Sequence, residues 1–423
     1  MTDTDRPHDL VIWGATGVAG RLVAEYLTEQ YTAADLSLAL GGRDETRLRR
    51  LEETLLAQST GWEALPIVVG DATDPESLRA LAEETRVVCT TVGPYTTYGT
   101  PLVEACLTAG TDYCDLTGEI NWVREMIDRY HDDALEAGVR IVHCCGFDSI
   151  PTDLGTKLAQ SFALEEFGAP CDLVRIYLEG GKGGVSGGTM SSVVEVFQAA
   201  SSDPVANQTL RNPYSLAPRG ERHGVDPGAQ ALPRHDALRG AWTAPSPMAV
   251  VNERVIRRSN ALLEYPWGRE FECREVVPVG SGPVGLAGAS AISAGLGLAI
   301  GALSFGPTRD ALQRFVFPDP GEGPTREEIE NGHFAIRVLG RGTTTDGPFV
   351  VESRISADQD PGYGATAKML GEAAMCLVTG EIESPLEGGV LTPASGLGDP
   401  LADGLRRAGL TVEVGTDDAG KPI

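Results

Sequence analysis

Short apolar runs alternate with amphipathic stretches along the first 150 residues of the chain. The runs are rich in Val, Ile and Leu, and the stretches between them repeat apolar residues at helical spacing. This alternation predicts βαβ units, and hence a doubly wound parallel sheet of the α/β class. The expected strands are 9–13, 36–40, 66–69, 86–91, 112–115 and 140–144, and the expected helices are 18–30, 44–58, 75–84, 99–109 and 121–137.

The pattern becomes less regular beyond residue 150. The stretch 201–247 is rich in Pro, Arg, His and Asn and has no clear period, which predicts a long irregular excursion or a lid. Weak alternation over 262–277 predicts a pair of strands. The other expected elements are strands at 173–179, 334–340, 348–355 and 410–414, and helices at 189–200, 363–379 and 399–408.

An uncharged segment, 276–308, interrupts this second region. Within it, residues 284–305 form an apolar run long enough to cross a bilayer, although its glycines lower the helix propensity. Three interpretations stay open at this point: a buried helix, a surface patch that docks on a membrane or a lipid-carrying partner, and a true membrane span.

The most informative stretch is residues 11–20, Val-Ile-Trp-Gly-Ala-Thr-Gly-Val-Ala-Gly, which leads from an apolar strand into an amphipathic helix. Gly14 suits a tight turn, Gly17 lets the backbone approach a pyrophosphate, and Gly20 lets the helix pack closely on the sheet. The first N–H groups of the helix then face the phosphates. We therefore predict a dinucleotide site, with a purely structural turn as the alternative. Its expected residues are Gly14, Ala15, Thr16, Gly17, Val18 and Gly20.

The end of the second strand indicates which nicotinamide nucleotide is bound. The first side chain beyond the glycines of that strand is Arg43, and a guanidinium there suits the 2′-phosphate of NADP. Asp44 counts against NADP, because a carboxylate turned inward would repel that phosphate, so NAD stays possible. Asp71 follows the third strand and is expected either to contact the adenine end or to cap its own turn.

The loop after the fourth strand is expected near the nicotinamide, because ligands in open α/β sheets lie beyond the carboxyl ends of the strands. Val92, Gly93 and Pro94 form this loop, and Gly93 permits a close backbone approach. Tyr95 and Tyr98 follow and bring phenols that either donate a proton or simply pack.

Asp148 lies just beyond the last strand of the first sheet, where the chain crosses into the second region. A buried carboxyl at such a junction can act as an acid, so Tyr95 is the first candidate for the proton donor and Asp148 the second. The alternative is that Asp148 or Ser149 caps the helix beginning near residue 152. Asp115 and Glu119 are expected to hold the Tyr95 loop rather than to act on a substrate.

The composition is strongly acidic: 60 Asp and Glu oppose 34 Lys and Arg, for a formal net charge of −26 over 423 residues. Such a field disfavours nucleic acid, and a lysine-poor acidic surface suggests a halophilic source. The eight cysteines show no metal-ligand spacing, so we expect no metal site. Reduced cysteines and a polar N-terminus predict a cytoplasmic protein, with membrane association through 284–305 left open.

Several motifs occur in a specific order and spacing: Gly14-Ala-Thr-Gly-Val-Ala-Gly20, Thr91-Val-Gly-Pro-Tyr95, Gly110-Thr-Asp-Tyr-Cys-Asp-Leu-Thr-Gly-Glu119, Cys145-Gly-Phe-Asp-Ser-Ile-Pro151, Ser186-Gly-Gly-Thr189 and Gly362-Tyr-Gly-Ala-Thr-Ala367. With them the chain resembles the saccharopine dehydrogenase-like oxidoreductases, in particular the branch that includes trans-acting enoyl reductases. The resemblance implies a Rossmann-type domain over 1–150, an inserted α+β substrate or dimerisation domain over 151–360, and a C-terminal return to the first domain over 361–423.

The resemblance also implies nicotinamide-dependent redox chemistry. We expect reduction of a C=C, C=N or C=O bond in an apolar, lipid-like small molecule, and a homodimer is compatible with this. Only Lys157, Arg175 and Lys182 are cations between Pro151 and Gln198, too few for the carboxylates of saccharopine. An amino-acid dehydrogenase and a non-catalytic NADP sensor are the alternatives.

Overall fold

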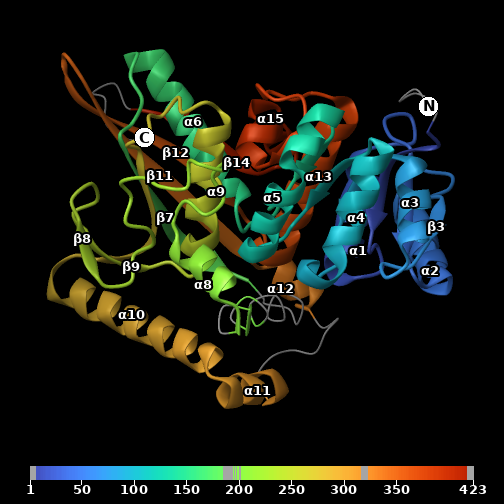
Figure 1. The fold of residues 1–423 in the computed structure, drawn as a ribbon, viewed down its shortest axis with the longest axis horizontal. Helices are drawn as coiled ribbons and strands as arrows, with labels where there is room; N and C mark the ends of the chain where they lie inside the picture. The colour runs from blue at the N-terminus through green and yellow to red at the C-terminus, as the bar shows by residue number, and fades with distance from the viewer. Residues whose placement is uncertain are drawn as a thin grey trace.

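Two seven-stranded sheets lie side by side in the computed structural model (Figure 1). The structure describes residues 6–183, 202–315 and 323–416, together with residues 194, 196, 198 and 199. The first sheet has the order β13-β6-β5-β4-β1-β2-β3 and all its strand pairs are parallel. The chain order reverses between β1 and β4, which is where ligands bind in sheets of this kind.

The elements of the first sheet up to β6 agree closely with the predicted ones, because each is a local run whose period can be seen in the sequence, whereas the edge strand β13 was not predicted. The fold class is therefore confirmed as α/β, with a parallel sheet of Rossmann type. The strands are β1 His8–Trp13, β2 Leu38–Gly42, β3 Ile67–Val69, β4 Thr85–Thr90, β5 Asp112–Asp115, β6 Arg140–Val142 and β13 Gly389–Leu391, and the first helices are α1 Val18–Gln30, α2 Glu45–Gln58, α3 Pro75–Glu83, α4 Tyr95–Ala109 and α5 Ile120–Ala137.

The C-terminal region returns to this sheet. Helix α13 (Thr366–Thr379) packs against α1 and β4, and β13 pairs with β6 at the sheet edge. Two tyrosines of the first region, Tyr26 and Tyr31, donate hydrogen bonds to Oε1 of Glu372 at 2.5 and 2.7 Å. The short helices α14 (Pro393–Gly396) and α15 (Asp399–Arg407) follow, but β14 (Thr411–Gly415) then pairs with β12 in the second sheet, so the return expected over 361–423 is only partial.

The second sheet is mixed and has the order β14-β12-β11-β7-β10-β9-β8. Strands β7 and β10 run parallel, and the other pairs are antiparallel. Helix α6 (Ile150–Phe167) packs on β11 and β12, and α9 (Ala249–Leu262) packs on β10 and α6. The strands are β7 Leu173–Lys182, β8 Arg234–Asp236, β9 Ala241–Pro245, β10 Glu272–Gly280, β11 His333–Thr344, β12 Gly347–Ala357 and β14 Thr411–Gly415.

One prediction for the middle of the chain is wrong, and another is only partly right. The excursion 201–247 contains helix α8 (Pro204–Arg211) and strands β8 and β9, and the expected strand pair at 262–277 is the single strand β10. The motif Ser186–Thr189 lies outside the described residues, and so does most of the helix expected at 189–200.

Helix α9 was not predicted. Arginines occupy several of its buried positions, so the helix lacks a continuous apolar stripe. Arg254 donates to the backbone carbonyls of Leu210 and Asn212, and Arg258 donates to those of Leu216 and Val390. These buried guanidinium groups fix the excursion, which is therefore ordered by side-chain to backbone hydrogen bonds rather than by regular structure.

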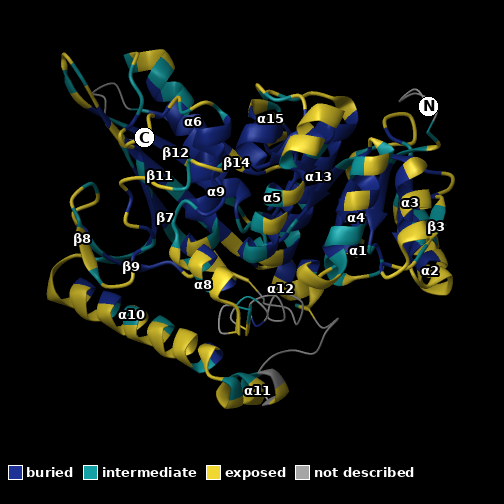
Figure 2. Ribbon diagram, viewed as in Figure 1, coloured by how far each residue is buried: buried dark blue, intermediate teal, exposed yellow. Residues whose placement is uncertain are grey.

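The uncharged segment forms helix α10 (Gly282–Ser304), followed by α11 (Gly306–Phe315). Helix α10 contacts β9 and β10 and otherwise lies along the outside of the molecule, as its exposed colouring shows (Figure 2). Only 11% of its most apolar window is buried, so the expectation of a buried helix is wrong. The remaining elements are α12 (Arg326–Glu330) and the π-helical turn η2 (Pro361–Ala365).

Candidate functional site

The glycine turn between β1 and α1 leaves no room for side chains. Gly14 has a φ of +92°, and a Cβ there would lie 2.8 Å from Cγ2 of Val92 and 2.9 Å from Oγ1 of Thr91. A Cβ on Gly20 would lie 2.3 Å from the carbonyl oxygen of Gly14. Because real Cβ atoms do not approach a backbone oxygen so closely, the start of α1 sits directly on the turn only with glycine at both positions.

The N-terminus of α1 has no side-chain cap among the described residues, and Gly323 lies against its first residue, Val18. Gly17 is the N-cap residue, in an extended conformation with φ −74° and ψ 169°, and no described side chain caps the helix. Its first turn carries no acidic residue. The first N–H groups and the positive end of the helix dipole are thus free to bind an anion, and the arrangement fits the diphosphate of a dinucleotide.

The basic side chains after β2 are exposed beside this turn. Asp44 is turned toward α2 as its N-cap and accepts a hydrogen bond from the N–H of Arg47 at 3.1 Å. The guanidinium of Arg47 donates to the carbonyl of Thr16 at 3.3 Å, and Arg43 is exposed. With the carboxylate of Asp44 engaged by the helix, this corner fits a 2′-phosphate.

Asp71 caps its own turn, which was one of its two expected roles. Its Oδ1 accepts hydrogen bonds from the backbone N–H and the hydroxyl of Thr73, both at 2.8 Å. These hydrogen bonds lower the pKa of Asp71, and the charge of Arg43 lowers it further. A contact between Asp71 and the adenine end stays a prediction.

The loop Val92–Pro94 leads into α4 and is held by Glu119, as expected. The carboxylate of Glu119 accepts hydrogen bonds from the N–H groups of Tyr95 and Thr96 at 2.9 and 2.8 Å. A carboxylate at the first turn of a helix satisfies N–H groups that would otherwise lack a partner. The residues Val92, Gly93 and Pro94 are in this way fixed at the carboxyl end of β4.

Tyr95 lies in the core. Its side chain is only 3% exposed, its ring stacks on Trp122 with centroids 5.4 Å apart, and its hydroxyl donates to the carbonyl of Thr90 at 3.1 Å. Burial raises the pKa of Tyr95 well above its ordinary value. Tyr98 is half-buried and packs against the same cluster. Both rings have the packing role that was the alternative to proton donation.

Asp148 lies at the carboxyl end of the sheet, next to the loop that follows β5. A Cβ built on Gly118 of this loop would be 3.5 Å from Oδ2 of Asp148. The interpretation of residues 148 and 149 as helix caps is wrong: α6 begins after Ser149 without a side-chain cap, and the Ser149 hydroxyl instead donates to Oδ1 of Asn252 at 3.0 Å. Burial raises the pKa of Asp148 to about 6, which suits a general acid near neutral pH.

A fully buried carboxyl, that of Glu275 on β10, lies close to the partly buried Asp148 and was missed in the sequence. Its two oxygens accept hydrogen bonds from the hydroxyl of Ser246 at 2.5 Å and from the amide of Asn252 at 2.7 Å. Burial raises the pKa of Glu275 to about 7, and the charge of Asp148 contributes to the rise. The one available signal was that Glu275 is the last charged residue before the uncharged segment.

The Glu275→Gln variant should be more stable than the wild-type protein at pH 8 and about equally stable near pH 4. Because the folded-state pKa of Glu275 is raised, the wild-type protein loses stability as the pH rises from about 4.5 through about 7. Glutamine can keep both hydrogen bonds and has no charge, so the difference reaches at most about 3 kcal/mol. Urea unfolding across this pH range measures it; parallel stability curves for the two proteins would contradict the assignment.

Asp115 joins the ends of β5 and β6. It accepts hydrogen bonds from the hydroxyl of Tyr113 at 2.9 Å and the N–H of Cys144 at 3.1 Å, and its Oδ2 is 2.7 Å from Nδ1 of His143. Cys144 has a φ of +64°, an uncommon conformation that the Asp115 hydrogen bond supports. Asp115 therefore acts on the scaffold of the site, but its hydrogen bonds join β5 to β6 and do not reach the Tyr95 loop, which Glu119 holds.

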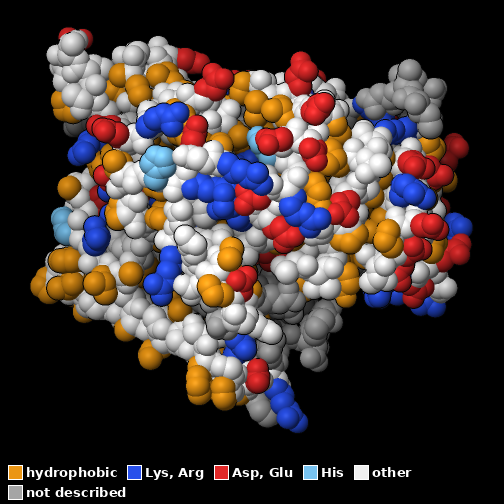
Figure 3. Space-filling view, viewed as in Figure 1, with side chains coloured by type: hydrophobic (Ala, Val, Ile, Leu, Met, Phe, Trp, Pro, Cys, Tyr) orange, Lys and Arg blue, Asp and Glu red, His pale blue; other side chains and the backbone are white. Residues whose placement is uncertain are grey.

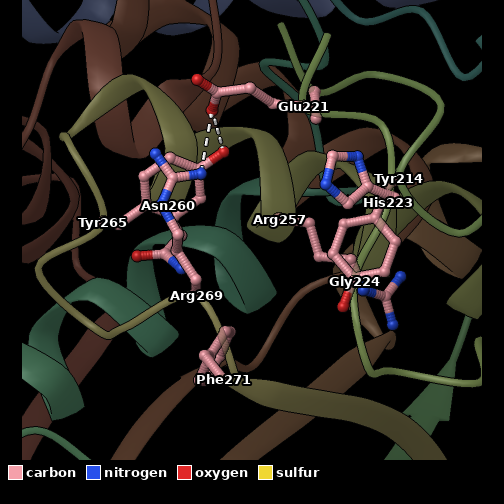
Figure 4. A pocket seen from close by; sticks show the side chains of 10 residues that line it. Tyr214, Glu221, His223, Gly224, Arg257, Asn260, Tyr265, Arg269 and Phe271 are labelled. Carbon is pink, nitrogen blue, oxygen red and sulfur yellow. Dashed lines mark hydrogen bonds and ion pairs between the residues drawn. The ribbon is translucent and has the colours of Figure 1, made fainter.

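A cavity of about 130 Å³ lies elsewhere, in the second region (Figure 4). It is lined by Tyr214, His223 and Arg257, and by Glu221, which pairs with Tyr265 and Arg269 across its mouth. None of the predicted site residues lines it. The cavity is therefore separate from the glycine turn and from Asp148.

Comparison with known proteins points to one family. The sequence family described as the saccharopine dehydrogenase NADP binding domain matches residues 10–142. A Mycobacterium tuberculosis protein, provisionally named a trans-acting enoyl reductase, is 41% identical over 98% of this chain and 99% of its own length. A trans-acting enoyl reductase of Mycobacterium bovis is 37% identical over 97% of this chain and 99% of its own length.

The fold also has a solved counterpart. Saccharopine dehydrogenase (L-Glu forming) from Saccharomyces cerevisiae superimposes with a TM-score of 0.53, covering 96% of this chain and 99% of the yeast chain. At 12% identity this likeness concerns the fold alone.

Proposed function

This chain belongs to the saccharopine dehydrogenase NADP-binding family, and from that membership we propose that it is an NADP(H)-dependent reductase of an apolar, lipid-like substrate. The reaction that we favour is reduction of an enoyl C=C bond, with reduction of C=N or C=O as the variant. The observation that carries the proposal is the uncapped N-terminus of α1, which follows a turn that requires glycine at positions 14 and 20, at the carboxyl edge of the sheet.

The chain's own groups have separate tasks in this proposal. The N–H groups at the start of α1 bind the diphosphate, Arg43 and Arg47 bind the 2′-phosphate, and the loop 92–94 orients the nicotinamide. A bound nicotinamide nucleotide supplies the hydride for one carbon of the double bond. The other carbon takes a proton, which completes the addition of two electrons and two hydrogens.

Asp148 is the proposed proton donor, in preference to Tyr95. The phenol of Tyr95 is enclosed and donates to a backbone carbonyl, whereas the Asp148 carboxyl accepts no hydrogen bond from any described residue. Its raised pKa keeps a fraction of the group protonated near neutral pH. Glu275, behind it, is a positioning residue that fixes Asn252 and Ser246.

The cations of the second region support an apolar substrate over an amino acid. Lys157 is buried and pairs with Glu383 at 3.1 Å and Asp399 at 2.7 Å. Arg175 lies 3.8 Å from Asp236. Since these two side chains are engaged within the protein, they are not available for the carboxylates of a saccharopine-like substrate. The third cation, Lys182, is exposed at the end of β7.

A turnover assay tests the proposal directly. Purified protein is supplied with NADPH carrying deuterium at C4, together with medium-chain enoyl thioesters or saccharopine in parallel reactions. We expect oxidation of NADPH with the enoyl compounds and one deuterium in the saturated product. Tight NADPH binding without turnover of any compound would favour the sensor alternative, and turnover of saccharopine alone would favour the amino-acid dehydrogenase.

The Arg43→Ala variant should bind NADPH about tenfold more weakly, a loss of about 1.4 kcal/mol, because the 2′-phosphate loses a guanidinium partner. Affinity for NADH should change less than twofold. Isothermal calorimetry with both nucleotides measures the two effects, and Arg79→Ala on α3 removes an equal charge from an exposed position as the control. Equal losses for NADPH and NADH would place Arg43 away from the 2′-phosphate.

A further inference from the structure

Helix α10 exposes apolar side chains around most of its circumference. Val284 is 84% exposed, Leu298 is 76% exposed and Ile300 is 41% exposed. Residues two apart in a helix project about 200° from one another, so Leu298 and Ile300 lie on opposite sides. Hydrophobic side chains recur along the lower left edge of the molecule, and no charged side chain lies between them there (Figure 3).

The helix is anchored at its beginning and projects at its end. A Cβ on Gly285 would meet the backbone of Gly280, and a Cβ on Gly288 would meet Val279, so the first turns lie against the end of β10. At Gly295, Gly297 and Gly301 no described atom lies within 4 Å of such a Cβ. A glycine-rich helix that touches little is unfavourable in water, whereas glycine is common in helices within lipid.

The topology excludes a single crossing of a membrane. Strand β10 ends just before α10, and β11 follows it in the chain; both pair with β7 in the same sheet. If α10 crossed a bilayer, β10 and β11 would lie on opposite sides, and the described chain shows no second helix that is long and apolar enough to bring it back. The helix can therefore enter a membrane only from one side.

We propose that α10 inserts into one leaflet of a lipid bilayer and docks the protein on that membrane. A bilayer covers apolar side chains on opposite sides of the helix at once, whereas a second copy of the chain would cover one side only. No charged residue occurs from Val276 to Thr308, although the whole chain carries a net charge of −26. We expect α10 to insert into a bilayer of zwitterionic lipid, because anionic lipid would repel the rest of the protein.

Docking does not rest on the proposed reductase activity, since vesicle binding can be measured without cofactor or substrate. It would place the catalytic site close to chains dissolved in lipid. Failure of vesicle binding would leave the reductase proposal standing, and failure of turnover would leave the docking proposal standing.

The test is co-sedimentation of the full-length protein with phosphatidylcholine vesicles. We expect the wild-type protein to sediment with vesicles at low and high salt alike, because the interaction is apolar. Leu298→Asp should reduce partitioning at least about tenfold, since an aspartate within a lipid-embedded helix is strongly unfavourable. Leu135→Asp, on α5 at a side chain that is 40% exposed, is the matched control and should partition as the wild-type protein does.

A second readout separates membrane docking from self-association. The emission of the tryptophan introduced by Leu298→Trp, measured as the difference from the wild-type protein, should shift to shorter wavelength on mixing with vesicles. Brominated lipid should quench this emission. NADPH affinity should be unchanged in Leu298→Asp, which shows that the variant is folded. A wild-type protein that stays in the supernatant overturns the proposal, and so does a dimer that Leu298→Asp dissociates while vesicle binding is absent.

Discussion

The Gly17→Asp variant should lose NADPH affinity by at least about 100-fold, or about 2.8 kcal/mol, without losing stability. Gly17 is exposed and has an extended backbone conformation that aspartate adopts readily, and a Cβ there would lie 3.2 Å from the carbonyl oxygen of Gly14, a contact that a small shift of the turn relieves. As an N-cap residue, aspartate would bind the N–H groups of the first turn and stabilise α1 by a few tenths of a kcal/mol. The same carboxylate would occupy the anion site and repel the diphosphate.

Calorimetry with NADPH and thermal unfolding measure the two effects on the same protein. Gly17→Asn is the matched control, because it has the same shape and capping capacity but no charge. We expect it to weaken binding at least tenfold less than Gly17→Asp. If aspartate left NADPH affinity unchanged, the start of α1 would not be the diphosphate site, and the reductase proposal would fall with it.

The Asp148→Asn variant should lower kcat by about 10² to 10³-fold while the Kd for NADPH stays the same. Asp148 is proposed to give a proton to the substrate and makes no contribution to binding the nucleotide. The pKa of Asp148 is raised to about 6, so the wild-type kcat should fall as the pH rises above about 6 and more carboxyl groups ionise. The variant should lack this dependence.

Tyr95→Phe is the control for Asp148→Asn. The Tyr95 hydroxyl donates to the carbonyl of Thr90 inside the core, so its removal should change kcat less than about threefold, with a small loss of stability. If Tyr95→Phe abolished turnover and Asp148→Asn did not, the first candidate named from the sequence would be the proton donor. Asp148→Asn should also unfold at a higher temperature than the wild-type protein at pH 8, because a buried charge is removed.

The first sheet could be predicted from the sequence because its information is local. Each strand and helix from β1 to β6 is a contiguous run with its own period, and the turn Gly14–Gly20 depends on three glycines within one segment. Helix α9 could not be predicted, since its buried arginines find their partners in a loop far away in the sequence.

The candidate site was predictable on the nucleotide side and poorly so on the substrate side. Asp148 was identified by its place after the last strand, but the sequence ranked Tyr95 above it, because a pattern cannot show that a phenol turns into the core. Glu275 was missed because only the packing of α9 against both β10 and α6 brings it near Asp148.

The pairing of β13 with β6 has a consequence for protein synthesis. The sheet that carries the nucleotide site is finished by residues 389–391, and α13 packs against α1 only after most of the chain has left the ribosome. We expect nascent chains to hold an unpaired sheet edge until that point, and a fragment ending at residue 150 to aggregate. The protein would then bind NADPH only late in translation, after residues 389–391 have been synthesised.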